Sequence, residues 1–385
     1  MLAELDAASL RRHRRVIEHY PHPGDSTRAI VDGGAVRVFC SNDYLGLARH
    51  PEVVAALHDT SAQFGCGSGA AHLVTGHSQA HHILEEDLAA FTGRERALLF
   101  STGYMANLGV LTTFAARNET VLGDRLNHAS LIDGARLSGA RLLRYAHADA
   151  AAAAQILAAQ TDCTLIATDG LFSMDGDVAP LRELATLATQ HRAWLLVDDA
   201  HGLGVLGASG RGSLEEANLT VNDVPLLMGT LGKAFGAFGA FVAGDAEVIE
   251  LLLQRARSYI YTTALPPAVA AAASAALRIS QRDTWRREKL RTLIERFRKG
   301  AAALQLPLMN STSPIQPLVA GDAASALRWS QALYAQGFWV GAIRPPTVPA
   351  DSARLRLTFS ASHSETDVDE LLTALERACR PEHSA

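Results

Sequence analysis

Short apolar runs alternate with longer amphipathic segments between about residues 95 and 280. This alternation is typical of an α/β protein with a mostly parallel sheet. The pattern predicts strands at 96–100, 120–124, 141–146, 163–169, 193–199, 225–230 and 239–245. Helices are expected between them, among them the alanine-rich segment 148–160 and the segment 180–191, where Pro180 suits a first helical turn.

The last hundred residues follow a different pattern. A long helical stretch, charged from 278 to 299, precedes a predicted strand 315–320, helix 323–336, strands 338–343 and 353–359, and helix 366–380. This order indicates a smaller α+β domain. We expect an N-terminal helix and strand segment at 1–42, a large domain at 43–281 and a small C-terminal domain at 282–385, with the basic run 11–15 on the solvated face of a short helix.

Composition excludes several classes of protein. With 385 residues, 48% hydrophobic and 19% charged, the chain has the composition of a folded protein of more than one domain. A formal charge of −5 gives no basic field for nucleic acid. No secretory signal or apolar span of membrane length is visible, and the four cysteines lie too far apart for a zinc finger. We therefore expect a cytoplasmic protein that binds no metal, nucleic acid or membrane.

Two glycine-rich segments imitate nucleotide-binding loops. Residues 202–207 match GxGxxG, but the turn-rich sequence ASGRGSLEEAN follows where a dinucleotide loop needs a helix. The segment around Lys233 resembles a P-loop, yet Leu227 occupies a position that requires glycine and Ala234 offers no hydroxyl to magnesium. A nicotinamide-dependent oxidoreductase that uses 202–207 stays open as an alternative.

Polar side chains follow three of the predicted strands. Loops at the carboxyl ends of parallel strands converge on one crevice, so these residues can act together. Asp198 follows the run AWLLV, where a buried carboxylate needs a cation such as a protonated pyridine nitrogen. His201 can reach the same face. Lys233 lies among glycine, alanine and phenylalanine, where desolvation favours a neutral amine that can form an imine, although a solvated surface lysine is the ordinary alternative.

Two further features suit a phosphorylated aromatic ligand. Gly103 and Tyr104 open a predicted helix directly after the strand 96–100, so their free N–H groups and the helix dipole form an anion site. Thr230 offers a hydroxyl to a phosphate, and His128 could lie over an aromatic ring, although a lone histidine is more often structural. Together with the imine-forming lysine and the acid, these residues predict a site for pyridoxal 5′-phosphate (PLP).

Seven motifs in this order resemble those of the α-oxoamine synthases, a family within the class II PLP-dependent aminotransferase superfamily. They are SNDYLGL (41–47), GCGSG (65–69), HLVTG (72–76), NHASLIDG (127–134), DGLFSMDG (169–176), DDAHG (198–202) and GTLGKA (229–234). The resemblance runs from about residue 5 to the C-terminus. It implies the type I fold of PLP-dependent transferases, a mostly parallel seven-stranded sheet in the large domain with a smaller α+β C-terminal domain, and a homodimer with active sites at the interface.

The resemblance also implies roles for individual residues. Lys233 would hold PLP covalently and later act as an acid and base, Asp198 would pair with the pyridine nitrogen, His201 would contact the ring oxygen and His128 would stack on the ring. The other implied cofactor contacts are Gly103, Tyr104, Ser173, Thr230 and, from a second subunit, Thr263. The implied substrate contacts are Arg11, Asn42, His128, Thr347 and Arg356.

Two of these substrate contacts have close alternatives. Arg356 would bind the amino-acid carboxylate through its guanidinium fork, and strand alternation places Arg354 on the same face. Arg12 matches the family pattern as well as Arg11 does.

The motifs at 72–77, 197–207 and 342–349 resemble the family members that condense L-alanine with a pimeloyl thioester, of coenzyme A or of an acyl-carrier protein, with loss of carbon dioxide. A glycine C-acetyltransferase or another member of the family is one alternative. A non-catalytic binding protein with this fold is another.

Overall fold

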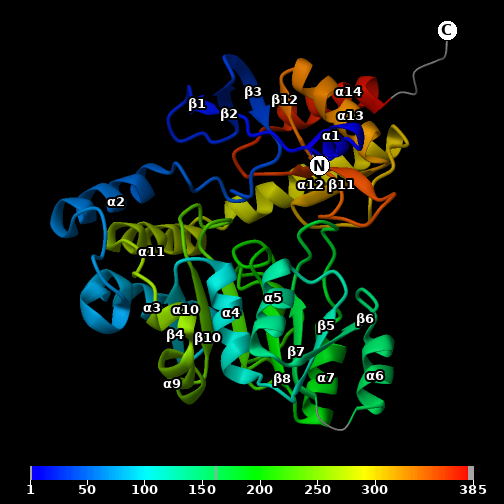
Figure 1. Ribbon diagram of the computed structural model, residues 1–385. Helices are drawn as coiled ribbons and strands as arrows, with labels where there is room; N and C mark the ends of the chain where they lie inside the picture. The colour runs from blue at the N-terminus through cyan, green and yellow to red at the C-terminus, as the bar shows by residue number, and fades with distance from the viewer. Residues whose placement is uncertain (1, 161–162, 380–385) are drawn as a thin grey trace. The chain divides into compact units, whose positions relative to one another are not determined.

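The computed structural model describes residues 2–160 and 163–379 (Figure 1). It divides into two compact units. The small unit contains the described residues within 1–50, 173–177 and 285–385, and the large unit contains those within 51–172 and 178–284. The domain boundaries predicted after residues 42 and 281 stay predictions.

The large unit is built on a seven-stranded sheet of order β4-β10-β9-β8-β7-β5-β6. The strands are β4 (Arg96–Phe100), β5 (Thr120–Asp124), β6 (Arg141–Tyr145), β7 (Cys163–Asp169), β8 (Trp194–Asp198), β9 (Leu226–Thr230) and β10 (Ala240–Gly244). Neighbours from β9 to β6 run parallel, and β10 runs antiparallel to both β9 and β4. The predicted fold class and all seven predicted strands are confirmed.

Helices cover both faces of this sheet, which explains why its central strands are apolar throughout. In β8, Leu196 belongs to one buried cluster, whereas Leu195 and Val197 belong to the other, because alternate side chains point to opposite faces. The first cluster packs α4 (Gly103–Phe114), α5 (Ala129–Ser138) and α9 (Ala246–Arg255). The second packs α6 (Ala150–Ala158) and α7 (Leu181–His191).

Local sequence sets where these helices begin. Thr102 caps α4, since its side chain accepts a hydrogen bond from the N–H of Met105 at 3.2 Å. Asp149 caps α6 in the same way. Pro180 lies at the N-cap of α7, one residue before the first turn where the sequence placed it. Residue 160, the predicted end of α6, lies beyond its observed end at Ala158.

The other helices of the large unit are α2 (Pro51–Phe64), the π-helix η1 (His72–Gly76), α3 (Gln79–Thr92), α8 (Ser213–Glu216), α10 (Arg257–Ile260) and α11 (Pro267–Arg282). The segment 202–207, which matches GxGxxG, forms turns, and the next helix is the four-residue α8. Because no helix opens at these glycines, they do not form a dinucleotide loop.

The small unit contains two further sheets. Its elements are α1 (Leu2–Ala7), β1 (Ile17–His19), β2 (Arg28–Val31), β3 (Gly34–Val38), α12 (Trp285–Ala303), β11 (Ile315–Gly321), α13 (Ala323–Ala335), β12 (Phe338–Trp339), β13 (Gly341–Ile343), β14 (Ala353–Thr358) and α14 (Glu365–Cys379). The sheets have the orders β1-β2-β3-β12 and β11-β14-β13. A strand from the C-terminal part thus pairs with β3, which ties the N-terminal residues to this unit.

Three details differ from the sequence predictions. The predicted strand 338–343 is two strands in different sheets, and the charged stretch 278–299 is divided between α11 and α12. The basic run 11–15 lies outside α1 in non-helical backbone. Its arginines form separate contacts, such as that of Arg15 with Asp32 at 3.1 Å.

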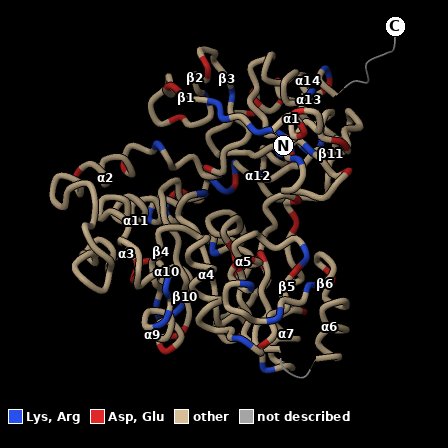
Figure 2. Tube along the Cα trace, in the orientation of Figure 1, with Lys and Arg blue, Asp and Glu red and all other residues tan. Residues whose placement is uncertain are grey.

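Figure 2 shows Lys and Arg mixed with Asp and Glu along both units, and α6 without charged residues. No broad field of one sign is visible in this trace, which agrees with the small net charge. Among the described residues, no helix is long and apolar enough to cross a bilayer.

The packing of α4 against α5 leads to a stability prediction. A Cβ added to Gly134 would lie 2.7 Å from Leu111 Cδ1 and 3.2 Å from the carbonyl oxygen of Asn107. Alanine gains about 1 kcal/mol of helix propensity over glycine, but overpacking costs about 1–3 kcal/mol. We expect Gly134→Ala to lower the melting temperature by a few degrees in a thermal unfolding experiment. Gly67→Ala, where nothing lies within 4 Å of the added atom, is the matched control and should leave it unchanged.

Candidate functional site

The polar residues singled out in the sequence gather at the carboxyl edge of the large sheet. Asp198 is the last residue of β8, and its register partner Asp169 is the last residue of β7. Thr230 ends β9, and His128 follows β5 as the N-cap of α5. Parallel strands present their carboxyl ends at one edge, so the sheet itself brings these residues together.

Lys233 lies in the loop that follows β9, and its amine meets a histidine. Lys233 Nζ and His201 Nε2 are 2.7 Å apart, within hydrogen-bond distance. His201 is buried in the loop after β8, and Lys233 is partly buried. The two loops therefore hold an amine and an imidazole in contact at the sheet edge.

Asp198 is 3% exposed, and its two carboxylate oxygens are held by different donors. Oδ1 accepts the N–H of Ala200 at 3.1 Å, and Oδ2 accepts the side-chain N–H of Asn107 at 2.7 Å. Within the described part of the chain, no lysine or arginine forms an ion pair with Asp198. A buried carboxylate held in this way is ready for a cationic partner.

Asn107 extends this contact into a chain of hydrogen bonds. Its side-chain amide also donates to Ser130 Oγ at 2.8 Å, and Ser130 Oγ lies 2.7 Å from His128 Nδ1. Both Asn107 and Ser130 are fully buried. Since Ser130 Oγ accepts from the amide, its own proton points to His128 Nδ1, which leaves the ring proton of His128 on Nε2.

Asp169 and His128 complete the cluster. Asp169 Oδ2 accepts the N–H of His128 at 2.8 Å. Burial, and next the charge of Asp198, raise the pKa of Asp169 well above its usual value. Burial lowers the pKa of His128; the charge of Asp198 opposes this shift, and that of Lys233 adds to it.

The predicted phosphate contacts lie on three segments of the large unit. Gly103 and Tyr104 form the first turn of α4, where N–H groups have no partner within the helix. Thr230 Oγ1 donates to the carbonyl of Gly239 at 3.0 Å. Thr263 lies in the segment between α10 and α11.

The two arginines of β14 have different partners in the small unit. Arg354 Nη1 forms an ion pair with Asp175 at 2.7 Å, and both side chains are largely buried. Arg356 donates to the carbonyl of Ser173 at 2.5 Å and to Asn42 Oδ1 at 3.1 Å. Arg356 is 7% exposed and, among the described residues, forms no ion pair with a carboxylate. Its charge is therefore available to an anionic ligand, whereas that of Arg354 is neutralised.

The remaining predicted substrate contacts also lie in the small unit. Arg12 Nη2 donates to Thr347 Oγ1 at 2.9 Å, whereas Arg11 forms an ion pair with Asp6 at 2.9 Å. Of the two arginines that the sequence left open, Arg12 is thus the one beside Thr347. Arg344 hydrogen-bonds to the backbone of Ser9, which holds this N-terminal segment in place.

Three residues of the cluster received no role from the sequence. Ser130 and Asp169 lie within the quoted motifs and Asn107 in the predicted helix after 96–100, but nothing local indicated their partners. The one available signal was Asn107, a polar residue among the apolar residues of α4. Its buried partners lie 23 and 91 residues away, which sequence spacing does not reveal.

The residues of the large unit fit PLP. The buried charge of Asp198 suits a protonated pyridine nitrogen, the amine of Lys233 suits an aldehyde, and the start of α4 suits a phosphate. The carbonyl oxygen of the Asn107 side chain is buried and has no hydrogen-bond partner among the described residues. The described residues alone therefore do not satisfy every polar atom around Asp198.

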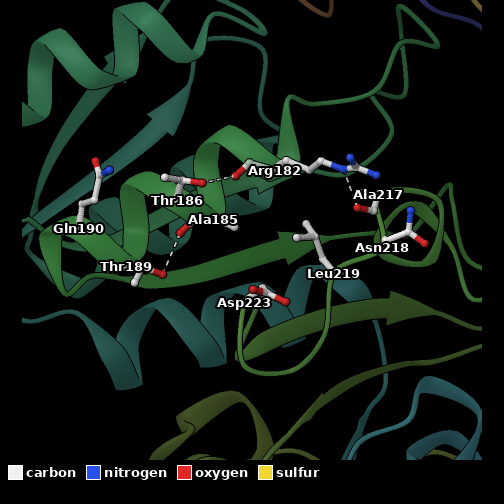
Figure 3. Close-up of a pocket in the computed structure, with 9 residues that line it drawn as sticks. All are labelled: Arg182, Ala185, Thr186, Thr189, Gln190, Ala217, Asn218, Leu219 and Asp223. Atoms are coloured by element: carbon white, nitrogen blue, oxygen red, sulfur yellow. Dashed lines mark hydrogen bonds between the residues drawn. The ribbon is translucent and has the colours of Figure 1, made fainter.

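A separate pocket of about 610 Å³ lies along α7 (Figure 3). Three of its polar side chains have local partners: Arg182 donates to the carbonyl of Ala217, and Thr186 and Thr189 donate to carbonyls of α7 itself. None of the predicted cofactor or substrate contacts lines this pocket. This pocket is therefore not part of the candidate site.

The chain is similar to several known proteins. The sequence matches the family model of class I and II aminotransferases over residues 36–375. It is 60% identical over 381 residues to 8-amino-7-oxononanoate synthase of Thioalkalivibrio sulfidiphilus, covering 98% of this chain and 96% of that protein.

Two solved structures are also similar. A structure of SPT (serine palmitoyltransferase) with a PLP internal aldimine has a TM-score of 0.92 and 31% identity, covering 98% of this chain and 95% of that one. The structure of 8-amino-7-oxononanoate synthase from Francisella tularensis has a TM-score of 0.78 and 31% identity, covering 89% and 97%.

Asp199, next to Asp198, gives a pH prediction. Burial raises the pKa of Asp199 to about 7, whereas an unfolded aspartate titrates near 3.9. Because the folded pKa is the higher one, the stabilisation from the protonated form is complete below about pH 4 and is lost as the pH rises to about 7. At about 1.4 kcal/mol per pH unit, the loss is up to about 4 kcal/mol.

We therefore expect Asp199→Asn to gain stability relative to the wild type between pH 5 and pH 8, measured by urea unfolding at both values. Asp59→Asn, at a side chain that is 78% exposed, is the control and should show no such change. An equal difference between Asp199→Asn and wild type at both pH values would contradict the assignment.

Proposed function

This chain belongs to the class I and II aminotransferase family, and from that premise we propose that it is an acyltransferase that condenses L-alanine with a pimeloyl thioester. The products are 8-amino-7-oxononanoate, carbon dioxide and free thiol, a step of biotin biosynthesis. The identity of 60% over nearly all of both chains supports this choice among the α-oxoamine synthases. The structural observation that carries it is the contact of Lys233 with His201 at the sheet edge that ends in the buried Asp198.

PLP is the cofactor that these residues suit. Bound PLP supplies an aldehyde that condenses with an amine and a cationic ring that withdraws electrons from the adjacent carbon. Lys233 would hold it through the amine, Asp198 would keep the pyridine nitrogen protonated, and His128 would cover the ring. Phosphate contacts would come from the N–H groups of Gly103 and Tyr104 and from Thr230, with Ser173 as a further contact.

Proton transfer would fall to Lys233 and His201. Lys233 Nζ would accept the proton from the alanine Cα as a general base and return it as an acid. His201 Nε2, 2.7 Å away, would orient that amine and donate to the ring oxygen when Lys233 is engaged elsewhere. Asn107 supports both ends of this arrangement, because its amide holds Asp198 and, through Ser130, His128.

Substrate binding would use the small unit. Arg356 would bind the alanine carboxylate, and Asn42 holds its guanidinium in position. Thr347 would contact the acyl substrate together with an arginine from the segment 11–12. Arg12 is the better candidate, since it lies beside Thr347 and Arg11 is paired with Asp6. The thioester would be carried by coenzyme A or by an acyl-carrier protein.

We also propose a homodimer and a cytoplasmic location. Tyr261 and Phe238 are large apolar side chains that are 71% and 50% exposed on the large unit. They lie within a few residues of Thr263 and Lys233 respectively, so a second subunit that covers them would bring Thr263 to the partner's phosphate site.

The decisive assay incubates the PLP-loaded protein with alanine and a pimeloyl thioester and identifies the product by mass. Glycine with an acetyl thioester is the comparison that separates the glycine C-acetyltransferase alternative. Asp198→Asn should lower kcat/KM by about 10²–10³-fold, the loss of about 2.7–4 kcal/mol that follows removal of one placed electrostatic group. Asp59→Asn should have wild-type activity. Normal turnover of Asp198→Asn would remove this residue from the site.

The two arginines of β14 give a second test. Arg356→Gln should raise the KM for alanine by about 10–100-fold, since a charged hydrogen-bonded contact contributes about 1.5–3 kcal/mol. It should affect KM for the thioester much less. Arg296→Gln, which removes an exposed arginine of the same unit, should alter neither constant. Unchanged alanine saturation in Arg356→Gln would show that another residue binds the carboxylate.

A further inference from the structure

A histidine-rich segment of the large unit has no part in the proposed reaction. Four histidines lie between residues 72 and 82, one on η1, one directly after it and two at the start of α3, and two glutamates follow at 85 and 86. Their spacing is not that of a zinc finger, and the sequence predicted no metal. The structure brings side chains of this segment together around a cavity of about 440 Å³ that none of the proposed cofactor or substrate contacts lines.

One of the four histidines is structural. His81 is fully buried, its Nδ1 accepts the N–H of Ser78 at 3.0 Å, and its Nε2 lies 2.6 Å from the carbonyl of Leu265. Since an N–H and a carbonyl occupy its two ring nitrogens, His81 has the Nε2–H tautomer and no free electron pair for a ligand.

A ring nitrogen of His72 contacts His77. The ring of His72 stacks on Tyr259 with centroids 4.9 Å apart, and its Nδ1 lies 3.1 Å from His77 Nδ1. His72 is buried, and its Nδ1 can accept the Nδ1–H of His77. This contact leaves His77 with its second ring nitrogen for another partner.

The other side chains form a set of three donors. One ligand atom each of His77, His82 and Glu85 lie within 4.8 Å of one another. The rings of His77 and His82 meet edge to face with centroids 6.0 Å apart. His82 and Glu85 are three residues apart on α3, which places them on one side of the helix. Both histidines are exposed, so small side-chain rotations can bring the three donors to a common centre.

The carboxylate of Glu85 has no cationic partner in the part of the chain that the structure describes. Its carboxylate accepts the N–H of Leu99 at 3.0 Å. Among residues 2–160 and 163–379, no lysine or arginine forms an ion pair with it. Arg96, which also lines the cavity, pairs instead with Glu250 at 2.8 Å. A partly buried carboxylate beside two imidazoles is a place where a bound cation is stabilising.

We propose that His77, His82 and Glu85 bind a divalent transition-metal ion of the zinc class, apart from the PLP site. Two imidazole nitrogens and one carboxylate oxygen are donors that suit Zn²⁺ and not Mg²⁺ or Ca²⁺, which prefer oxygen. The contact of His77 with His72 is the outer hydrogen bond that fixes the orientation of a ligating histidine. Glu86 Oε1, 3.3 Å from His82 Nε2, is within reach as a further oxygen donor. The ion would tie η1 to α3.

The test uses isothermal titration calorimetry with ZnCl2 on the PLP-loaded protein, purified without a histidine tag and freed of excess PLP. We expect one Zn²⁺ per chain and no heat with MgCl2. His82→Gln and Glu85→Gln should each weaken binding at least 10-fold, since even outer-sphere partners contribute about 10–100-fold. His58→Gln, an exposed histidine on α2, is the matched control and should bind as the wild type does.

His82→Gln changes an exposed side chain, so its fold and its synthase activity should be unchanged, which circular dichroism and the product assay check. Zn²⁺ should also raise the melting temperature of the wild type but not that of His82→Gln. The proposal is overturned if the wild type takes up no Zn²⁺, or if His82→Gln and His58→Gln bind it equally well.

Discussion

The buried negative charge of Asp198 is the constraint on which the candidate site depends. A carboxylate that is 3% exposed would be costly without compensation, and within residues 2–160 and 163–379 its hydrogen-bond donors are neutral, the N–H of Ala200 and the amide of Asn107. These donors hold the charge without cancelling it. Asp169 ends the adjacent strand, and burial, and next the charge of Asp198, raise its pKa well above its usual value. The end of β8 thus holds a carboxylate in a fixed position for a cationic ligand.

The sheet makes this position rigid. Asp198 ends a strand that pairs on both sides, and the helix that carries Asn107 packs on one face of the same sheet. The amide of Asn107 also reaches Ser130 on α5, so two helices and a strand fix the same carboxylate. Close packing of α4 and α5, in which Gly134 has no room for a side chain, keeps these donors at hydrogen-bond distance. The chemistry therefore depends on core packing as well as on the residues that contact the ligand.

Sequence patterns predicted the parts of this arrangement that local physics controls. The seven strands were predicted because each is an apolar run between turn-forming residues, and Lys233, Asp198 and His201 were found because they follow such runs. Long-range pairing could not be predicted. The segment 338–343 was expected to be one strand, yet its two halves join different sheets, and the basic run 11–15 is non-helical, with Arg12 and Arg15 in contact with distant residues. For the same reason Ser130 and Asn107 received no role, and Arg11 and Arg12 could not be distinguished.

Two buried residues of the same type on one strand can differ in whether a partner neutralises their charge. Arg354 and Arg356 are both buried on β14, but Asp175 neutralises only Arg354. Arg356 is held by a carbonyl and an amide oxygen, which orient a guanidinium while leaving its charge uncancelled. Asp198 and Glu85 have the corresponding property among the carboxylates, since both accept N–H groups and neither has a cationic partner in the described parts of the chain. A fold that can neutralise Arg354 with one aspartate could do the same for the others, so the missing counter-charges mark the places where ligands of opposite charge belong.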